Sequence, residues 1–132
     1  MVNVEPYLKE LTSNLKKFQE QKILCDTVLT AVDGEVWAHS VVLAAASSYI
    51  CSTLMELGDA RVGIRYSIGL PGCDKQSIEV ALQFLYTGEL IMPDTFQNSD
   101  EFKRILCVFK ELGIEISKLN GAKVVFHNTS KR

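Results

Sequence analysis

The stretch from Cys25 to Leu54, CDTVLTAVDGEVWAHSVVLAAASSYICSTL, decides how this chain folds. Two short apolar segments flank an Asp-Gly pair at positions 33–34, and both residue types tolerate positive φ. This pattern predicts a β-hairpin over residues 27–38. If side chains alternate strictly along the returning strand, Trp37 lies on its buried face and Glu35 shares that face nearer the turn.

After the hairpin, the apolar residues change to a helical spacing over residues 41–56. Residues 41–46 are apolar on every side, so this segment needs cover from other parts of the chain or from a second chain. The Ser47-Ser48 pair competes for backbone hydrogen bonds and can divide the segment into two short helices. The residues at helical spacing are Val42, Leu43, Ala46, Tyr49, Ile50 and Leu54.

Length and composition favour one globular domain. The chain has 132 residues, 47% of them hydrophobic, and a formal net charge of −2. That charge recommends neither nucleic acid nor an anionic membrane as a partner. We find no apolar run long enough for a membrane span and no secretory signal at the N-terminus.

Four cysteines, Cys25, Cys51, Cys73 and Cys107, are widely spaced and form no C-x-x-C pair. This distribution is typical of reduced structural thiols in the cytosol or nucleus, although sequence alone leaves disulfides open. A zinc site needs about four Cys or His ligands at short spacings, so we expect no metal site.

A first helix is predicted over residues 6–21, where Glu5-Pro6 provides a suitable start. Leu8, Leu11, Leu15 and Phe18 form one apolar stripe along it. Pattern alone favours packing of this stripe on its own domain. Packing on a partner chain is the alternative.

Further along the chain, residues 64–70 predict a short strand. Asp74 is a good N-cap for a helix over residues 75–86, and Gly88 suits its left-handed end. Residues 90–92 can form another short strand, followed by a polar loop.

The last main helix is expected from Ser99 or Asp100 to about Leu112, with Gly113 ending it. Its predicted inner residues are Phe102, Ile105, Leu106, Phe109 and Leu112. Residues 114–119 can form a further turn. Residues 120–132 resemble a tail or a linker.

Residues capable of catalysis are scarce. The sequence holds no nucleotide-binding, nucleophile-elbow or metalloprotease motif, and its two histidines are His39 and His127. His39 is expected to hydrogen-bond the local backbone. Asp94, Asp100 and Glu101 suit helix capping and a solvated face. We therefore expect no enzyme and no cofactor.

Two motifs carry a resemblance to a known family. Cys25-Asp-Thr-Val-Leu, the Asp-Gly turn and Ala38-His-Ser-Val-Val-Leu-Ala-Ala-Ala-Ser-Ser-Tyr resemble the signature of the BTB/POZ domain. Ala81-Leu-Gln-Phe-Leu-Tyr-Thr-Gly-Glu-Leu resembles that family's second signature. The resemblance covers residues 7–119.

This resemblance implies an α+β fold, in which a helical cluster is capped by a small mixed β-sheet. It assigns residues 1–119 to the BTB/POZ domain and residues 120–132 to a tail or linker. Members with an extra N-terminal helix form homodimers through that helix, so the resemblance reverses the first interpretation of the stripe. The implied dimer residues are Tyr7, Leu8, Leu11, Leu15 and Phe18.

Two functions of the family compete. BTB–zinc-finger transcription regulators use the domain to dimerise and recruit corepressors in the nucleus, while zinc fingers outside this chain read DNA. Ubiquitin-ligase adaptors use it to bind a cullin, with a cytoplasmic location as the alternative. The linker-like residues 120–132 favour the regulator, because adaptors continue into a further helical box.

Two sites bear on this choice. Many zinc-finger members form a charged central pocket from the signature aspartate and a basic residue; here Asp26 matches but Ser40 stands at the basic position. We expect Asp26 to be hydrogen-bonded by hydroxyl or backbone donors. Leu54-Met55-Glu56 fits the hydrophobic-x-Glu pattern of adaptors, which makes Leu54 and Glu56 candidate cullin contacts.

Overall fold

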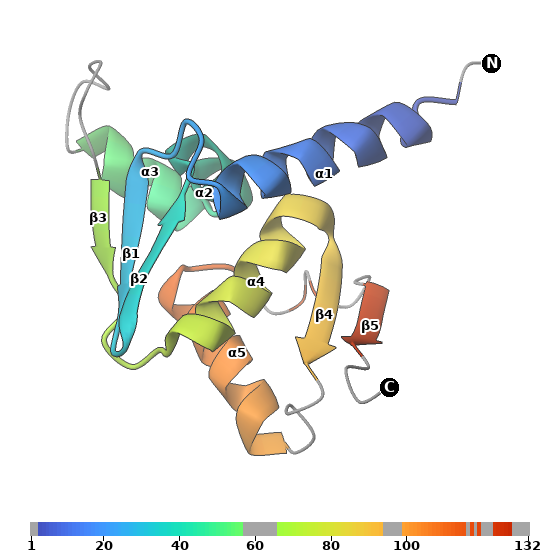
Figure 1. Cartoon of the computed structure of the whole chain (residues 1–132). Helices are drawn as coiled ribbons and strands as arrows, with labels where there is room; N and C mark the ends of the chain where they lie inside the picture. The colour runs from blue at the N-terminus through green and yellow to red at the C-terminus, as the bar shows by residue number, and fades with distance from the viewer. Residues whose placement is uncertain are drawn as a thin grey trace.

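The computed structural model describes residues 3–56, 66–93, 99–115, 117, 119 and 123–127. Its elements are arranged as an α+β fold, with helices packed around a small mixed sheet (Figure 1). In chain order they are α1 (Glu5–Glu20), β1 (Thr27–Ala31), β2 (Gly34–Ala38), α2 (Ser40–Ala46), α3 (Ser48–Glu56), β3 (Tyr66–Gly69), α4 (Lys75–Thr87), β4 (Glu89–Pro93), α5 (Ser99–Glu111) and β5 (Lys123–His127).

The predicted hairpin is present as β1 and β2, which pair antiparallel, and β3 joins β1 in parallel to give the order β2-β1-β3. The predicted face of β2 was wrong. Val36 and Ala38 are buried, whereas Trp37 is half-buried and Glu35 is exposed. Val36 lies opposite Leu29, and cross-strand neighbours share a face, so the buried side of β1 fixes the buried side of β2.

The apolar segment after the hairpin divides at Ser47, as predicted, into α2 and α3. Ser47 has extended backbone angles, φ −137° and ψ 114°. Its hydroxyl donates to the Leu112 carbonyl at 2.7 Å and accepts the Ile50 backbone N–H at 3.1 Å. The break changes the helical phase, and Tyr49, which a continuous helix would place on the inner stripe, is 60% exposed.

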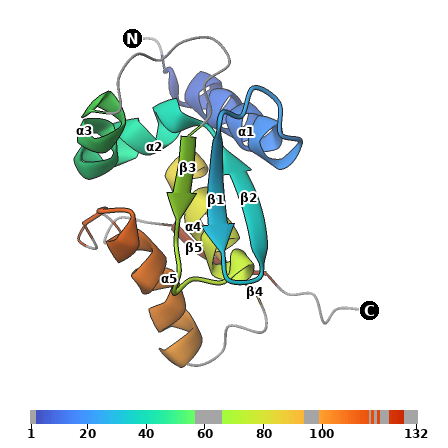
Figure 2. The ribbon, with the colours of Figure 1, turned by 90° about the vertical axis from the view of Figure 1, so that its left-hand side faces the viewer.

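Helix α4 is the centre of the core and lies behind the three-stranded sheet in Figure 2. Ile78, Ala81 and Leu82 have no exposed surface. Asp74 caps the helix by accepting the Ser77 backbone N–H at 2.8 Å, as its position predicted. Gly88 ends the helix at φ 81°, a conformation that costs glycine little.

Helix α5 packs against α4, where the rings of Phe84 and Phe109 meet edge to face with their centroids 5.6 Å apart. Ile105, Phe109 and Leu112 are buried as predicted, and so is Val108. Phe102 was wrongly placed inside, since it is among the exposed large hydrophobic residues.

A second sheet joins β4 to the C-terminal part of the chain, because β5 pairs with β4 in parallel. The prediction of a tail or linker over residues 120–132 is therefore wrong for residues 123–127. Strand pairing between segments this far apart leaves no local signal. The domain boundary at residue 119 stays a prediction, and most of the polar loop predicted after residues 90–92 lies outside the described residues.

Among the described residues, no helix combines the length and the hydrophobicity that crossing a membrane requires.

Candidate interaction surfaces

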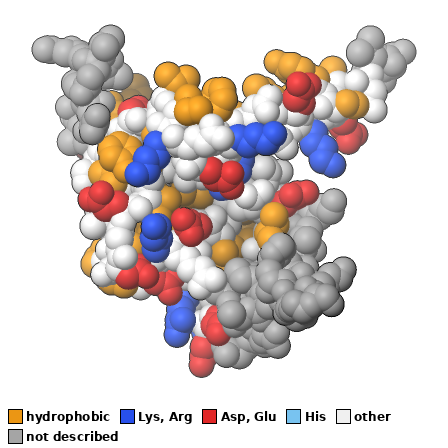
Figure 3. All heavy atoms as spheres, viewed as in Figure 1, with side chains coloured by type: hydrophobic (Ala, Val, Ile, Leu, Met, Phe, Trp, Pro, Cys, Tyr) orange, Lys and Arg blue, Asp and Glu red, His pale blue; other side chains and the backbone are white. Residues whose placement is uncertain are grey.

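The apolar stripe of α1 lies largely outside the core of its own chain. Tyr7 is 63% exposed, Leu8 48%, Leu11 41% and Phe18 37%. Leu15 alone is half-buried and packs against the core. Hydrophobic side chains gather along the upper edge of the molecule in Figure 3, over α1 and α2. The association face, as we call it, consists of four residues of α1 and one of α2: Tyr7, Leu8, Leu11 and Phe18, together with Val41.

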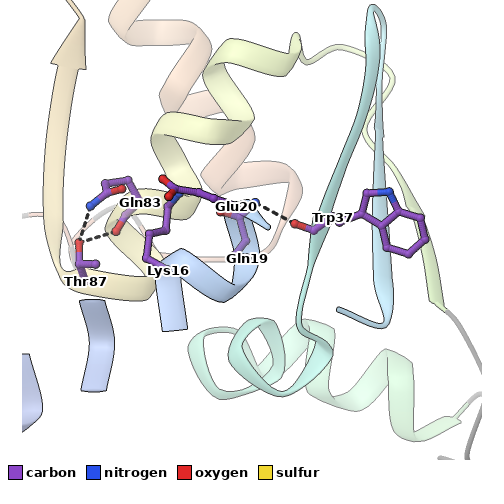
Figure 4. A network of polar contacts seen from close by, with 6 residues as sticks. All are labelled: Lys16, Gln19, Glu20, Trp37, Gln83 and Thr87. Carbon is purple, nitrogen blue, oxygen red and sulfur yellow. Dashed lines mark hydrogen bonds and ion pairs between the residues drawn. The ribbon is translucent and has the colours of Figure 1, made fainter. Parts of the chain in front are cut away.

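The C-terminal end of α1 is fixed to the hairpin. Gln19 is buried, and its side-chain amide donates to the Trp37 carbonyl at 2.9 Å. One turn away, the Lys16 ammonium lies 3.1 Å from the Glu20 carboxylate (Figure 4). The helix then extends past α4 toward the N-terminus (Figure 1). Its direction is therefore set by its own domain, while its stripe is left for another surface.

An apolar hollow adjoins this face. It has a volume of about 410 Å³ and is lined by residues of α1, α2 and α4. Its lining is almost wholly aliphatic: Leu15, Val41, Val42, Ala45, Ala46, Leu85 and Tyr86. Val41 is 72% exposed although it lies in the first turn of the apolar helix α2. The segment that required cover from this chain or a second one is thus only partly covered by its own chain.

Asp26 and Ser40, the candidate central pocket, do meet. The Ser40 backbone N–H donates to one carboxylate oxygen of Asp26 at 2.7 Å, and its hydroxyl donates to the other at 2.6 Å. Thr27 adds a hydroxyl donor at 3.1 Å. Burial raises the pKa of Asp26, but these hydrogen bonds outweigh it and hold the pKa below its ordinary value of 3.8. The expected hydroxyl and backbone donors are confirmed, and they replace a basic partner.

His39 and Tyr86 connect the two signature motifs. The Tyr86 hydroxyl accepts the His39 backbone N–H at 3.0 Å and lies 2.6 Å from His39 Nδ1. Because the Tyr86 hydroxyl oxygen already accepts the backbone N–H, we assign the hydroxyl as the donor to Nδ1, which is then the unprotonated ring nitrogen. Nε2 therefore carries the ring proton and donates it to the Ile23 carbonyl at 2.8 Å. The His39 ring thus bonds a backbone carbonyl 16 residues away rather than the local backbone that was predicted, and the residue joins the start of α2 to the end of α4.

The hydrophobic-x-Glu motif lies at the end of α3, and its residues have different surroundings. Leu54 is 8% exposed and belongs to the core, so little of it is left for a partner. Met55 is 75% exposed, and Glu56 is also exposed. Met55 is therefore the accessible apolar side chain of this motif, and the contacts at Leu54 and Glu56 stay predictions.

Tyr49, at the start of the same helix, is exposed and lies beside the end of α5. A methyl group added at Gly113, which ends α5 at φ 72°, would lie only 2.7 Å from the Tyr49 Cβ. Close approach and positive φ both require glycine here. We call Tyr49, Met55, Glu56 and Gly113 the docking face. Sequence reasoning missed Tyr49, and its only available signal was the serine pair that breaks the helix before it.

Metal ligation finds no support in the described part of the chain, which holds no group of three His, Cys, Asp or Glu residues able to hold an ion. The cysteines are all free thiols, with Cys73 buried and Cys25, Cys51 and Cys107 half-buried.

The fold and these surfaces define a protein-interaction domain, and the comparison with protein families identifies its class. A family model described as BTB/POZ domain matches residues 15–117. The chain therefore belongs to the BTB/POZ family. Domains of this family are protein–protein interaction modules rather than enzymes.

Among curated proteins, the chain is similar to Kelch-like protein 3 of Rattus norvegicus. The two are 32% identical over 91 residues, which cover 68% of this chain and 15% of that protein. Kelch-like protein 3 of Homo sapiens is 33% identical over 76 residues, or 58% of this chain and 13% of that protein. The chain thus spans only a small part of the length of these relatives.

Solved structures share the fold. The BTB domain of zebrafish PATZ1 superposes with a TM-score of 0.64 at 20% identity, covering 85% of both chains. The BTB domain of human Gigaxonin gives a TM-score of 0.62 at 23% identity, again covering 85% of both. At these identities the likeness shows the fold alone.

Proposed function

We propose that this chain is the homodimeric BTB module of a ubiquitin-ligase adaptor and binds the N-terminal region of a cullin. The observation that carries the proposal is the 32% identity with a Kelch-like protein. Within the BTB/POZ family, kelch-type proteins are ubiquitin-ligase adaptors. Cytoplasm and nucleus are both compatible with this role.

The exposed association face supports the homodimer. Four large apolar side chains of α1 and Val41 of α2 are exposed, Val41 also lines the hollow, and exposed apolar surface of this kind marks interaction sites. A two-fold axis lets the same patch cover itself, so a second copy buries each side chain without a further partner.

The docking face supports the cullin contact. Tyr49 and Met55 supply exposed apolar surface on α3, and Glu56 adds a negative charge at its end. Aromatic and methionine side chains are enriched in interfaces, where a few such residues carry most of the binding energy. The face lies on α3 and the end of α5, so it does not use the stripe of α1.

The transcription-regulator reading now has weaker support. It rested on a linker-like end, but residues 123–127 form a strand paired with β4. The charge-compensated central pocket also lacks its basic residue, because Ser40 stands at that position and supplies the hydrogen bonds to the Asp26 carboxylate. Corepressor recruitment therefore serves as the competing outcome in the test.

The test measures binding of the chain to a cullin N-terminal fragment by calorimetry, with wild type expected to bind. Met55→Ala and Glu56→Ala should each weaken binding at least about tenfold, or ~1.4 kcal/mol. Glu79→Ala, which removes an exposed acid of α4, is the matched control and should leave the affinity unchanged. Absence of binding by wild type, or full affinity in both variants, would contradict the proposal.

A further inference from the structure

Strand β2 forms one edge of the three-stranded sheet, because β1 lies on its inner side and no described strand pairs with its other side (Figure 2). The main-chain N–H and C=O groups on such an edge can pair with another chain. The register of the sheet shows which groups of β2 point toward the open side.

Glu35 presents its main chain to that open side. It lies opposite Thr30 in the antiparallel pair of β1 and β2. The Thr30 carbonyl accepts the Leu70 N–H at 2.9 Å, so it points away from β2. Because opposite residues in an antiparallel pair exchange both hydrogen bonds or neither, Glu35 bonds no group of Thr30. Its N–H and C=O therefore point outward, where no described strand takes them up.

Gln19 of α1 covers the next outward-pointing carbonyl of this edge, which belongs to Trp37. The side-chain amide N–H of Gln19 donates to that carbonyl at 2.9 Å (Figure 4). Only the amide nitrogen can donate, so this bond fixes which end of the side chain is Oε1. Oε1 is buried and has no hydrogen-bond donor among the described residues. An unsatisfied buried acceptor costs free energy, which a bound N–H donor would recover.

A groove follows this edge. It has a volume of about 540 Å³, and its lining combines Glu35, Val36 and Trp37 of β2 with residues of α1, including Gln19, and of α4. That volume is within the range of ligand sites in proteins. Because two helices flank the edge, the groove leaves room for one extended segment rather than for the edge of a second folded sheet. We call it the β2 groove.

The charges of the β2 groove cancel. Three lysines and three glutamates line it: Lys16, Lys22, Lys75, Glu20, Glu35 and Glu79. A groove without net charge has no general attraction for a polyanion such as nucleic acid. It matches instead an occupant whose main interactions are the uncharged N–H and C=O groups of a peptide main chain.

We propose that the β2 groove is a docking site for an extended peptide segment of a partner protein, which adds a strand to the sheet beside β2. Main-chain hydrogen bonds to Glu35 supply affinity, a donor near Gln19 Oε1 adds to it, and the groove walls select side chains. The groove shares no residue with the association face or the docking face. It therefore goes beyond the proposed cullin contact and leaves the dimer free to form.

The experiment selects linear peptides of about ten residues, long enough to add a strand, from a phage-displayed library on the purified chain. Selected peptides are titrated by calorimetry, and amide exchange of the chain is followed by NMR with and without peptide. We expect bound peptide to slow exchange of the Glu35 amide at least about tenfold, because that N–H becomes hydrogen-bonded.

Two proline variants locate the site. Glu35→Pro removes the outward N–H and spares the bonds to β1, and proline is tolerated where a strand N–H faces outward. It should weaken peptide binding at least about tenfold. Ser67→Pro is the matched control on β3, the opposite edge. Its neighbour Tyr66 donates its N–H to Asp26 on the β1 side, so the Ser67 N–H points outward, and this variant should keep full affinity.

Failure to select any binding peptide, full affinity in a folded Glu35→Pro chain, or binding that leaves Glu35 exchange unchanged would overturn the proposal. Slower Glu35 exchange at rising chain concentration without peptide would assign the edge to a second copy and overturn it as well. Circular dichroism shows whether both variants fold, and the exchange measurement on wild type decides without any variant. None of these measurements involves the docking face, so cullin binding is decided separately.

Discussion

Helices α1 and α4 carry the same kind of apolar stripe, yet the chain treats them in opposite ways. The stripe of α4 includes Ile78, Ala81 and Leu82, which have no exposed surface. The stripe of α1 leaves Leu8 and Leu11 nearly half exposed. Helical periodicity therefore shows that a surface needs cover, but it does not show whether the cover comes from the same chain. Substitutions in the two helices should separate folding from association.

The largest expected effect comes from the buried stripe. Leu82→Ala should lower the free energy of unfolding by about 2–5 kcal/mol, because it removes contacts and leaves a cavity between α4 and its neighbours. Urea denaturation of the chain measures the change. Leu8→Ala on α1 is the matched control, and at dilutions where the chain is monomeric it should cost under about 0.5 kcal/mol. Equal losses in both variants would show that α1 is as much a part of the core as α4.

The exposed stripe should govern association instead. Leu11→Asp places an unpaired charge in the proposed interface, and two-fold symmetry places it there twice. We expect dimerisation to weaken by roughly 100-fold or more, or at least ~2.7 kcal/mol, with folding retained. Light scattering coupled to size exclusion measures the mass, and circular dichroism checks the fold. Ser13→Asp introduces the same charge at an exposed position of α1 outside the apolar stripe and controls for charge alone. A fully dimeric Leu11→Asp chain would remove α1 from the interface.

Local signals in the sequence were enough for most of the fold. The Asp-Gly turn, the capping Asp74, the left-handed Gly88 and the break at Ser47 all fall where their residue types predict. Each of these depends on backbone conformation within a few residues. Signals of this range can be read without knowing the rest of the structure.

What failed depended on partners far away in sequence. The buried face of β2 is set by β1, because Val36 pairs with Leu29, whereas alternation alone leaves open which of the two faces is buried. Strand β5 exists through its pairing with β4. The motif at the end of α3 was recognised as a pattern, but only packing shows that Leu54 faces inward and Met55 outward.

The contact between the two signature motifs offers an intermediate test. Tyr86→Phe removes the hydroxyl that serves both the backbone N–H and Nδ1 of His39, leaving buried polar atoms unpaired. The free energy of unfolding should fall by about 1–3 kcal/mol. Tyr49→Phe removes an exposed hydroxyl and should change it by less than about 0.5 kcal/mol. If both changes have equally small effects, the His39–Tyr86 contact does not fasten α2 to α4.

The smallest effect concerns the N-cap of α4. In α1, by contrast, the N-cap residue is Val4, which makes no side-chain capping hydrogen bond. Asp74→Ala should cost about 1 kcal/mol near neutral pH, whereas Asp74→Ser keeps a capping oxygen and should cost less. Burial raises the pKa of Asp74, but the Ser77 hydrogen bonds outweigh it and leave the pKa below 3.8.

A depressed pKa means that the cap's electrostatic stabilisation is fully present above the ordinary value and is lost as pH falls through the folded one. The difference in unfolding free energy between wild type and Asp74→Ser should therefore shrink from about pH 6 to about pH 3. Asp26 titrates equally in both proteins, so its contribution cancels. Urea unfolding at each pH measures the difference. A difference that is constant over this range would mean that the Asp74 charge adds nothing to the cap, and that hydrogen bonding alone starts the helix that the chain buries most completely.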